Sequence, residues 1–264
     1  PDPRLSMALV YRDYSMNYQN FFSNAFSEGS HNSNEKGIYI GILSQLHKRI
    51  SLYAHADHFR FPWLKYRVDA PSNGCEYVTQ LILTPSRRTD LQFRYRYLKK
   101  QINSASAAGF TDYPESEVNQ NFRMQINFRA TESLTLKTRI ETTNWQKPDS
   151  DKRTGFLIHQ DLIFNHEVKP WQISTRFALF DTDTYDQRLY AYENDVLYSF
   201  SVPAYYYRGS RFYLMGKYSF GRKMDIWIRY SITYYADRQT IGSGLDEISG
   251  NKKSEIKIQM RIRF

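Results

Sequence analysis

Basic side chains recur at alternate positions along several stretches of this sequence. Arg94 and Arg96, for example, alternate with Phe93 and Tyr95. A period of two places alternate side chains on one face of a β-strand, so the arginines are predicted to share a face. A guanidinium group only donates hydrogen bonds and pairs with carboxylates or phosphates, so this face is expected to bind anions. The basic residues predicted on it are Arg12, Arg94, Arg96, Arg123, Arg129, Lys137, Arg139, Arg176, Arg229, Lys257, Arg261 and Arg263.

Acidic residues of the same parity are fewer than the basic ones. Those that clearly oppose the arginines are Asp57, Glu76, Glu141, Asp225 and Glu255. One interpretation is a ladder of arginine–carboxylate pairs that fills and stiffens the inside of a β-barrel. The other is an electropositive passage that favours nucleic acid, phosphorylated sugars or acidic peptides. The sequence leaves both open. The basic residues predicted to line the lumen are Arg94, Arg96, Arg123, Arg129, Arg139, Arg176, Arg229 and Arg261.

No pattern of catalytic or metal-binding residues stands out. The six histidines are scattered, and the spacing of His55 and His58 places them on opposite faces of a strand, which argues against a shared metal ion. His159 and Asp161 share a face, with Ser174 expected on the neighbouring strand. Residues of one parity on adjacent strands meet by chance constantly, however. We therefore predict no metal, no cofactor and no enzymatic activity.

The last stretch of the chain shows most clearly which elements would carry these residues. In residues 253–264, KSEIKIQMRIRF, apolar residues occupy one parity and mostly charged or amide residues the other. One apolar and one charged face are typical of a membrane barrel with lipid outside and water inside, and a soluble β-sandwich is the alternative. The terminal Phe264 resembles the end of the closing strand of bacterial outer-membrane proteins, which implies that the barrel-assembly machinery reads it.

The composition is consistent with a barrel and excludes two other classes. Aromatic residues make up 16% of the 264 residues, yet hydrophobic residues total 41% and the mean hydropathy is −0.65. A barrel strand turns only alternate residues toward lipid, which accounts for this combination. No stretch approaches the roughly 18 apolar residues of a membrane-spanning helix. The single cysteine, Cys75, excludes a disulfide framework. The net charge of +9 would suggest nucleic acid as the partner of a soluble protein.

About fourteen antiparallel strands are predicted for residues 1–264, which we interpret as one outer-membrane β-barrel domain. Long connections alternate with short ones, as in outer-membrane barrels with extracellular loops and periplasmic turns. A tight turn at Asn194-Asp195 would divide the least regular stretch into strands at 185–193 and 196–204. The chain opens PDPRLSMALVY, which is not a signal peptide, so we expect a mature chain or the tail of a longer one.

Three stretches resemble a known family. They are RFPWLKYRVDAPSNG at 60–74, YENDVLYSFSVPAYYYRGSRFYL at 192–214 and DRQTIGSGLDEISGNKKSEIKIQMRIRF at 237–264, and residues 1–26 also fit. They are similar to the C-terminal part of Bacteroidota outer-membrane proteins in which a helix-hairpin-helix module precedes a long barrel. The resemblance implies the C-terminal part of a wider barrel, with DNA uptake as a role. No such module is recognised here, because the Gly-Ser-Gly at 242–244 is flanked by predicted strands instead of paired helices.

From these patterns we expect an antiparallel transmembrane β-barrel in the bacterial outer membrane, either whole or as part of a wider barrel. The leading functional hypothesis is a porin-like transport or uptake channel with a basic lumen and DNA as a candidate cargo. The alternative is a non-conducting structural subunit of a larger outer-membrane complex. The expected partners are outer-membrane lipid and lipopolysaccharide, the barrel-assembly machinery and other outer-membrane proteins, with nucleic acid as a further candidate.

Overall fold

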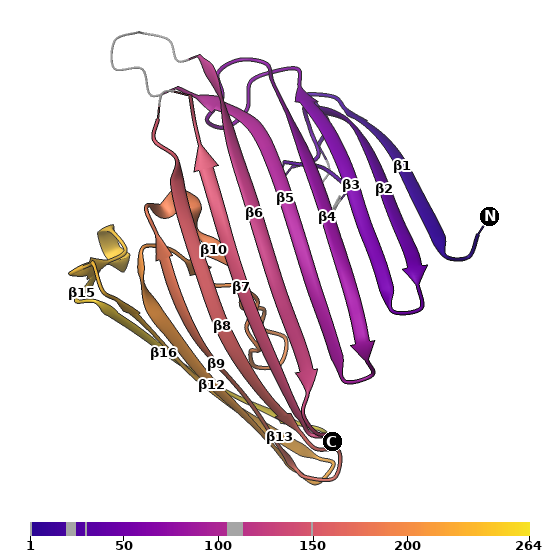
Figure 1. Ribbon diagram of the computed structural model, residues 1–264. Helices are drawn as coiled ribbons and strands as arrows, with labels where there is room; N and C mark the ends of the chain where they lie inside the picture. The colour runs from indigo at the N-terminus through magenta and orange to yellow at the C-terminus, as the bar shows by residue number, and fades with distance from the viewer. Residues whose placement is uncertain (1, 20–24, 30, 105–112, 149) are drawn as a thin grey trace. The chain divides into compact units, whose positions relative to one another are not determined.

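The chain folds as an antiparallel all-β protein, which confirms the predicted fold class at that level. The computed structural model describes residues 2–19, 25–29, 31–104, 113–148 and 150–264. Alternation of polar residues with β-branched and aromatic ones favours strands with two distinct faces. The long strands within these residues (Figure 1) are β1 (Leu5–Tyr14), β2 (Glu35–His47), β3 (Ile50–Phe61), β4 (Ser72–Ser86), β5 (Thr89–Asn103), β6 (Pro114–Arg129), β7 (Leu134–Gln146), β8 (Arg153–Asn165), β9 (Trp171–Thr182), β12 (Arg208–Phe220), β13 (Met224–Tyr235) and β16 (Lys252–Ile262).

These twelve strands follow one another in a single hydrogen-bonded order, from β1 through β9 to β12, β13 and β16. Successive long strands are neighbours in the sheet, so the connection between two strands helps to set their register. Six smaller elements lie in the connections after β9 and β13. They are η1 (Tyr185–Gln187), β10 (Leu189–Tyr190), β11 (Ala204–Tyr205), β14 (Thr240–Ile241), η2 (Gly244–Asp246) and β15 (Ile248–Ser249).

The strands predicted at 185–193 and 196–204 were wrong. This stretch forms the single 3-10 turn η1 and the two-residue strands β10 and β11. Leu189 and Tyr205 pack into a buried cluster with residues of β8 and β9, so the stretch lies against the sheet instead of extending it. The main sheet therefore has twelve strands among the described residues, where about fourteen were predicted.

Long and short connections alternate along this twelve-strand order. The short connections are 48–49, 87–88, 130–133, 166–170 and 221–223, and the long ones are 15–34, 62–71, 104–113, 147–152, 183–207 and 236–251. The alternation therefore does not require the two strands that were predicted within 185–204.

The chain packs as two compact units. The first comprises Pro1–Leu83, Phe93–Phe122 and Asn144–Lys152, and the second comprises Thr84–Gln92, Arg123–Thr143 and Arg153–Phe264. Strands β1, β2 and β3 belong wholly to the first unit, and β8, β9, β12, β13 and β16 belong wholly to the second.

Each unit has its own apolar cluster. In the first, Phe59, Phe61 and Leu98 are buried together, with the ring centroids of Phe59 and Phe61 5.8 Å apart. The larger cluster of the second unit joins strands to the connections after β9 and β13. Its members are Leu157, Ala178, Phe180, Leu189, Ala191, Tyr205, Tyr235 and Ile241.

The second unit exposes its apolar face and buries its polar one. In β13, Ile228 is 53% exposed whereas the adjacent Arg229 is fully buried. In β16, Ile256 and Ile258 are exposed and Lys257 between them is half-buried. A soluble sheet buries its isoleucines, so this inverted pattern fits a wall with lipid on its outside. The alternation predicted for residues 253–264 is confirmed. Among the described residues, no helix is long and apolar enough to cross a membrane.

Two glycines of β12 provide a matched test of packing in the second unit. A Cβ on Gly209 would lie 2.1 Å from the backbone oxygen of Tyr234 and 2.8 Å from the Phe180 ring, whereas a Cβ on Gly216 meets nothing within 4 Å. We expect Gly209→Ala to lower the free energy of unfolding by about 1–3 kcal/mol, because the backbone must shift. Gly216→Ala should have little effect. Thermal unfolding in detergent micelles measures both, and equal midpoints would contradict this account.

Candidate functional site

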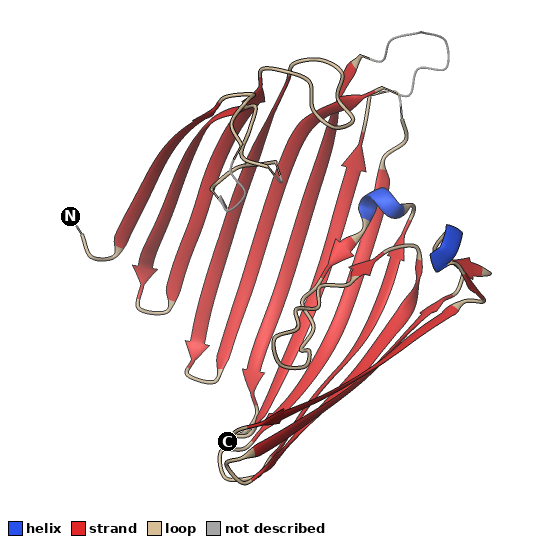
Figure 2. Ribbon diagram, turned by 180° about the vertical axis from the view of Figure 1, so that it is seen from behind, coloured by secondary structure: helices blue, strands red, loops and turns tan. Residues whose placement is uncertain are grey.

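The connection from β9 to β12 folds back onto the polar face of the second unit (Figure 2). Residues 188–207 of this connection are called the inner segment. It follows η1, where the Thr184 N–H donates to the side-chain oxygen of Gln187 at 2.9 Å. Within the inner segment β10 pairs with β11, and a further bridge joins Glu193 to Ser201. These local bonds present the side chains around Glu193 to the strands of the sheet.

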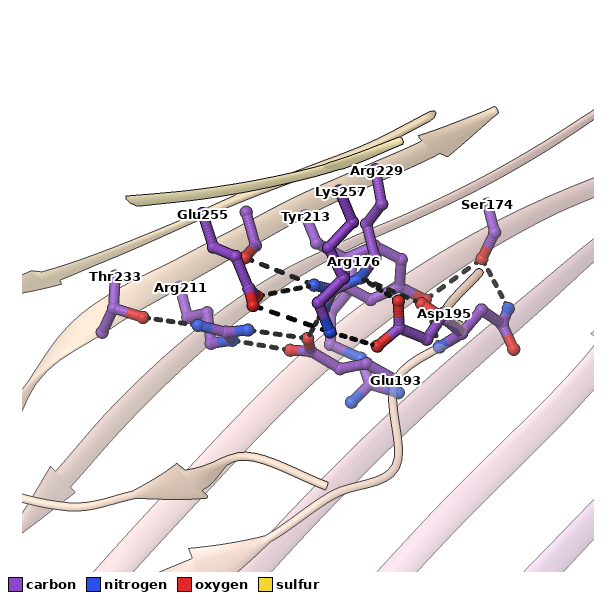
Figure 3. A network of polar contacts seen from close by, with 12 residues as sticks. Ser174, Arg176, Glu193, Asp195, Arg211, Tyr213, Arg229, Thr233, Glu255 and Lys257 are labelled. Carbon is purple, nitrogen blue, oxygen red and sulfur yellow. Dashed lines mark hydrogen bonds and ion pairs between the residues drawn. The ribbon is translucent and has the colours of Figure 1, made fainter. Parts of the chain in front are cut away.

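Glu193 is the centre of the network drawn in Figure 3. Its side chain is fully buried, and its carboxylate accepts hydrogen bonds from Arg211 Nε and Nη2 at 2.8 and 2.9 Å. Arg229 Nη2 also donates to it, and the Tyr205 hydroxyl donates at 2.9 Å. The side chain of Arg229 is itself fully buried. One carboxylate of the inner segment therefore compensates arginines on two adjacent strands, β12 and β13.

Asp195 links the inner segment to β16, the last strand of the sheet. It accepts hydrogen bonds from Lys257 Nζ at 2.8 Å and from the Val196 N–H at 2.7 Å, and it lies 3.8 Å from Arg229 Nε. Burial raises the pKa of this carboxyl, but the two hydrogen bonds and the charges of Arg229 and Lys257 outweigh burial and hold the pKa below the usual 3.8. Asp195 is therefore ionised, and paired, at neutral pH.

The charges around Glu193 and Asp195 pair with one another. The cations Arg211, Arg229 and Lys257 meet the anions Glu193, Asp195 and Glu255, whereas Arg176, which Figure 3 also draws, pairs with Asp161. Uncharged groups extend it, since Asn194 Nδ2 donates to Ser174 Oγ at 2.5 Å and Ser174 shares a hydrogen bond with the Tyr213 hydroxyl at 3.1 Å. This arrangement can hold the inner segment against the sheet, and it leaves little net charge for an external anion.

A second charged cluster lies on β6 to β9 of the same unit. Glu141 accepts hydrogen bonds from Arg123 Nε and Nη2, both at 3.0 Å, and from Arg139. Asp161 accepts two from Arg176, at 2.6 and 2.8 Å. Arg139 also donates to a backbone carbonyl of β10 at 2.9 Å, which ties this cluster to the inner segment. Three arginines share two carboxylates here, so the cluster keeps a net positive charge.

A third cluster lies where β13 begins and β16 ends. Asp225 accepts hydrogen bonds from Arg261 Nη2 at 2.5 Å and from Arg263 Nη2 at 2.6 Å. The Ser219 hydroxyl donates to the other oxygen of the same carboxylate at 2.6 Å. Both basic residues at the end of the chain are thus paired.

The first unit uses the same chemistry on its own strands. The Arg12 guanidinium donates to both oxygens of Asp57, at 2.8 and 2.9 Å, and to Glu35 at 2.5 Å. All three side chains are nearly or fully buried. Arg96 donates to Glu76 at 2.6 Å. Buried charges in this unit are therefore also held by carboxylates of the chain itself.

Most of the arginines predicted to line a lumen are paired with carboxylates. Arg94 is half-buried on β5, Arg129 is exposed at the end of β6, and Phe264 lies exposed beyond the end of β16. A carboxylate lies within ion-pair distance of Arg96, Arg123, Arg139, Arg176, Arg229 and Arg261, and Arg94 also interacts with other residues. These pairs fit the predicted ladder. That the residues line a lumen, and that Phe264 signals assembly, stay predictions.

Sequence reasoning missed four side chains of these clusters. Glu193 fell at the end of the strand predicted at 185–193, Asp195 fell in the tight turn predicted at Asn194-Asp195, and Glu35 fell in a predicted polar loop, so none was counted on the charged face. Arg211 was also missed, because its strand was predicted to begin after it. The one available signal was a pair of acids, Glu193 and Asp195, in an aromatic-rich stretch without sustained alternation.

The three residues considered for hydrolysis do not form a nucleophile–base pair. The register sets Ser174 opposite Ile163 and Ala178 opposite His159, so serine and histidine lie roughly 13 Å apart along the strands. His159 Nδ1 lies 3.2 Å from Asp161, on the same strand. A serine nucleophile needs its base within hydrogen-bond reach. Within the part of the chain that the structure describes, no group of three or more His, Cys, Asp or Glu side chains could hold a metal ion.

Comparison with known proteins bears on the fold alone. No family model and no curated protein matches this chain. Among solved structures, the copper transporter OprC is similar with a TM-score of 0.51 and 8% identity, over 86% of this chain and 40% of that one. A FadL homologue from Pseudomonas aeruginosa has a TM-score of 0.39 and 11% identity, over 86% and 66%. OmpT, an outer membrane protein of Vibrio cholerae, has a TM-score of 0.36 and 8% identity, over 98% and 94%.

The likeness to OprC assigns the sheet to the fold of bacterial outer-membrane β-barrel proteins. This fold confirms the predicted location in the bacterial outer membrane. The chain spans less than half the length of OprC.

The burial of Glu193 leads to a prediction about stability. Glu193→Gln would remove the buried carboxylate that Arg211 and Arg229 share, and we expect it to lower the free energy of unfolding by about 3–5 kcal/mol. Glu255 also contacts Arg229, but its side chain is 47% exposed. Glu255→Gln is therefore the matched control and should cost less than about 1 kcal/mol. Chemical unfolding in micelles measures the free energy of unfolding of both variants. Equal decreases would show that Glu193 contributes no more to stability than Glu255 does.

The lowered pKa of Asp195 leads to a prediction about pH. Because the pKa is lower in the folded than in the unfolded chain, Asp195 contributes its full stability above the unfolded value of 3.8 and loses it as the pH falls through the folded value. We expect the protection factors for hydrogen exchange in residues 188–207, which are corrected for the intrinsic exchange rate at each pH, to fall in that acid range. Asp195→Asn should exchange faster already at neutral pH. Protection of the inner segment that is unchanged in acid would refute this coupling.

Proposed function

We propose that this chain forms part of an outer-membrane β-barrel whose lumen is filled by the inner segment, so that the barrel does not conduct ions at rest. The exposed isoleucine row and the buried polar face support a wall between lipid and an interior. The observation that carries the proposal is the burial of Glu193 against Arg211 and Arg229, because it anchors a connection on the polar face of the sheet.

Closure of the sheet is part of this proposal. Strands β1 and β16 are the two ends of the strand order. A strand edge in lipid leaves backbone N–H and C=O groups without partners, which costs several kcal/mol per group. Each of these two edges is therefore expected to pair with another strand.

The charge balance supports the structural role over an open basic channel. Three cations of the network meet three anions, and the interior next to β12, β13 and β16 is bridged by ion pairs. A passage for polyanions would instead present unpaired arginines. We therefore favour a non-conducting structural subunit that works together with other outer-membrane proteins.

Transport or uptake is the second candidate function. Its support is the net charge of +9 and the excess of arginine in the cluster around Glu141 and Asp161. DNA as the cargo rests on the resemblance to the helix-hairpin-helix family and on this charge. Transport requires the inner segment to leave the polar face, which would break the bonds of Glu193 and Asp195.

Conductance across planar lipid bilayers tests the proposal on the native protein purified from outer membranes. We expect almost no steady current for the unmodified protein. The double variant Glu193→Gln with Asp195→Asn should conduct, because it loosens the inner segment. The matched control is Asp181→Asn, which removes an exposed pair with Arg208 and should stay closed. A large steady current through the unmodified protein would refute the proposal and favour the channel.

Copurification and DNA binding separate the two candidate roles further. A structural subunit should retain a stable set of outer-membrane partners when it is purified under mild conditions. An uptake channel should bind DNA with an affinity that falls steeply as salt rises, because bound phosphates release counterions. DNA binding without stable partners would favour uptake.

A further inference from the structure

A pocket lined by tyrosines lies in the second unit, between the connections that follow β9 and β13. Its volume is about 310 Å³, near the lower end of the range for small-molecule sites. It contains none of the charged residues of the network around Glu193. The lining residues that matter here are Tyr185, Tyr206, Tyr207, Tyr235, Arg238 and Thr240.

The tyrosine rings form a preassembled wall. The ring centroid of Tyr206 lies 5.0 Å from that of Tyr185, 5.1 Å from that of Tyr207 and 5.6 Å from that of Tyr235. Rings at these distances support one another, mostly in edge-to-face geometry. The wall therefore needs little rearrangement to receive a ligand.

The backbone of Tyr207 is held in an unusual conformation. Its φ of 61° lies in the left-handed region, which is disfavoured for an aromatic residue. Thr182 maintains it from two sides. The Thr182 N–H donates to the Tyr207 carbonyl at 2.9 Å, and the Tyr207 N–H donates to Thr182 Oγ1 at 2.7 Å. Backbone strain that neighbours enforce in this way is common at binding sites.

This conformation places the Tyr207 ring against a cation. The guanidinium carbon of Arg238 lies 3.5 Å from the Tyr207 ring centroid. Arg238 is exposed, and among the described residues it has no carboxylate within ion-pair distance. It thus differs from the paired arginines of the polar face. Stacking covers one face of the guanidinium and leaves its N–H groups able to bind an oxyanion.

We infer that this pocket binds one acidic sugar residue, a pyranose ring that carries a carboxylate. Arg188 lies over the Tyr185 ring and Arg238 over the Tyr207 ring, and the ring faces that these cations leave uncovered are electron-rich and attract the C–H groups on one face of a sugar ring. The hydroxyls of the tyrosines and of Thr240 can both donate to and accept from sugar hydroxyls. Arg238 pairs with the carboxylate through charge-assisted hydrogen bonds. A neutral sugar cannot form the ion pair with Arg238. A simple anion forms neither the contacts with the tyrosine rings nor the hydrogen bonds between hydroxyl groups.

Isothermal titration of the native protein with glucuronate, glucose and inorganic phosphate tests this inference. We expect glucuronate to bind with an affinity about tenfold or more above that of glucose or phosphate, because only glucuronate meets both the rings and Arg238. Arg238→Gln should lower the affinity for glucuronate to that for glucose. Arg222→Gln is the matched control, an exposed arginine at the turn between β12 and β13, and it should bind like the unmodified protein.

Equal affinities for the three compounds, or glucuronate binding unchanged in Arg238→Gln, would overturn the inference. Phosphate binding as tight as that of glucuronate would also overturn it, since the rings would then contribute nothing. Thermal unfolding verifies that Arg238→Gln folds, which is expected of an exposed side chain. A uronic acid oligosaccharide distinguishes the source of the sugar: tighter binding than that of the monosaccharide assigns a polymer, and equal binding assigns the free sugar. The result is independent of whether the barrel conducts.

Discussion

The buried charge of Arg229 is the constraint on which the second unit depends. A guanidinium removed from water without a partner is costly by several kcal/mol, so β13 can bury Arg229 only if carboxylates reach it. Glu193 supplies one of them from the connection between β9 and β12. The same period of two that buries Arg229 exposes Ile228 beside it. A lipid-facing row and a charged interior are thus two consequences of one alternation.

This requirement also explains why the connection after β9 is long and folded inward. The inner segment carries Glu193 and Asp195 to strands β12, β13 and β16, where they meet the basic side chains. Its last residues contribute both to the network around Glu193 and to the tyrosine pocket. The Tyr205 hydroxyl donates to Glu193, while Tyr206 and Tyr207 form the wall of the tyrosine pocket. The charge network and the pocket are therefore joined by three consecutive residues.

The first unit also compensates a buried arginine with a carboxylate, and there the connection that is held in place is the one between β1 and β2. Glu35, at the start of β2, pairs with Arg12 and also accepts hydrogen bonds from the backbone N–H groups of Glu28 and Gly29 at 3.0 and 3.2 Å. One buried carboxylate again ties a connection to a basic residue of a strand. In both units the arginines of the polar face act first as internal anchors, and this is why their number alone is a poor guide to what the protein binds.

The amino-acid sequence by itself determined the twelve long strands, their antiparallel order and the faces of the sheet, but it also predicted two strands within 185–204 that do not form. Strands such as 253–264 repeat their apolar and polar residues with a period of two, and this local pattern needs no knowledge of distant residues. Only the tertiary structure decided that residues 188–207 fold inward and that Glu193 neutralises Arg211 and Arg229. Those contacts join residues far apart along the chain, from a stretch without a period. The charge of the interior depends on such pairings, and no local pattern encodes them.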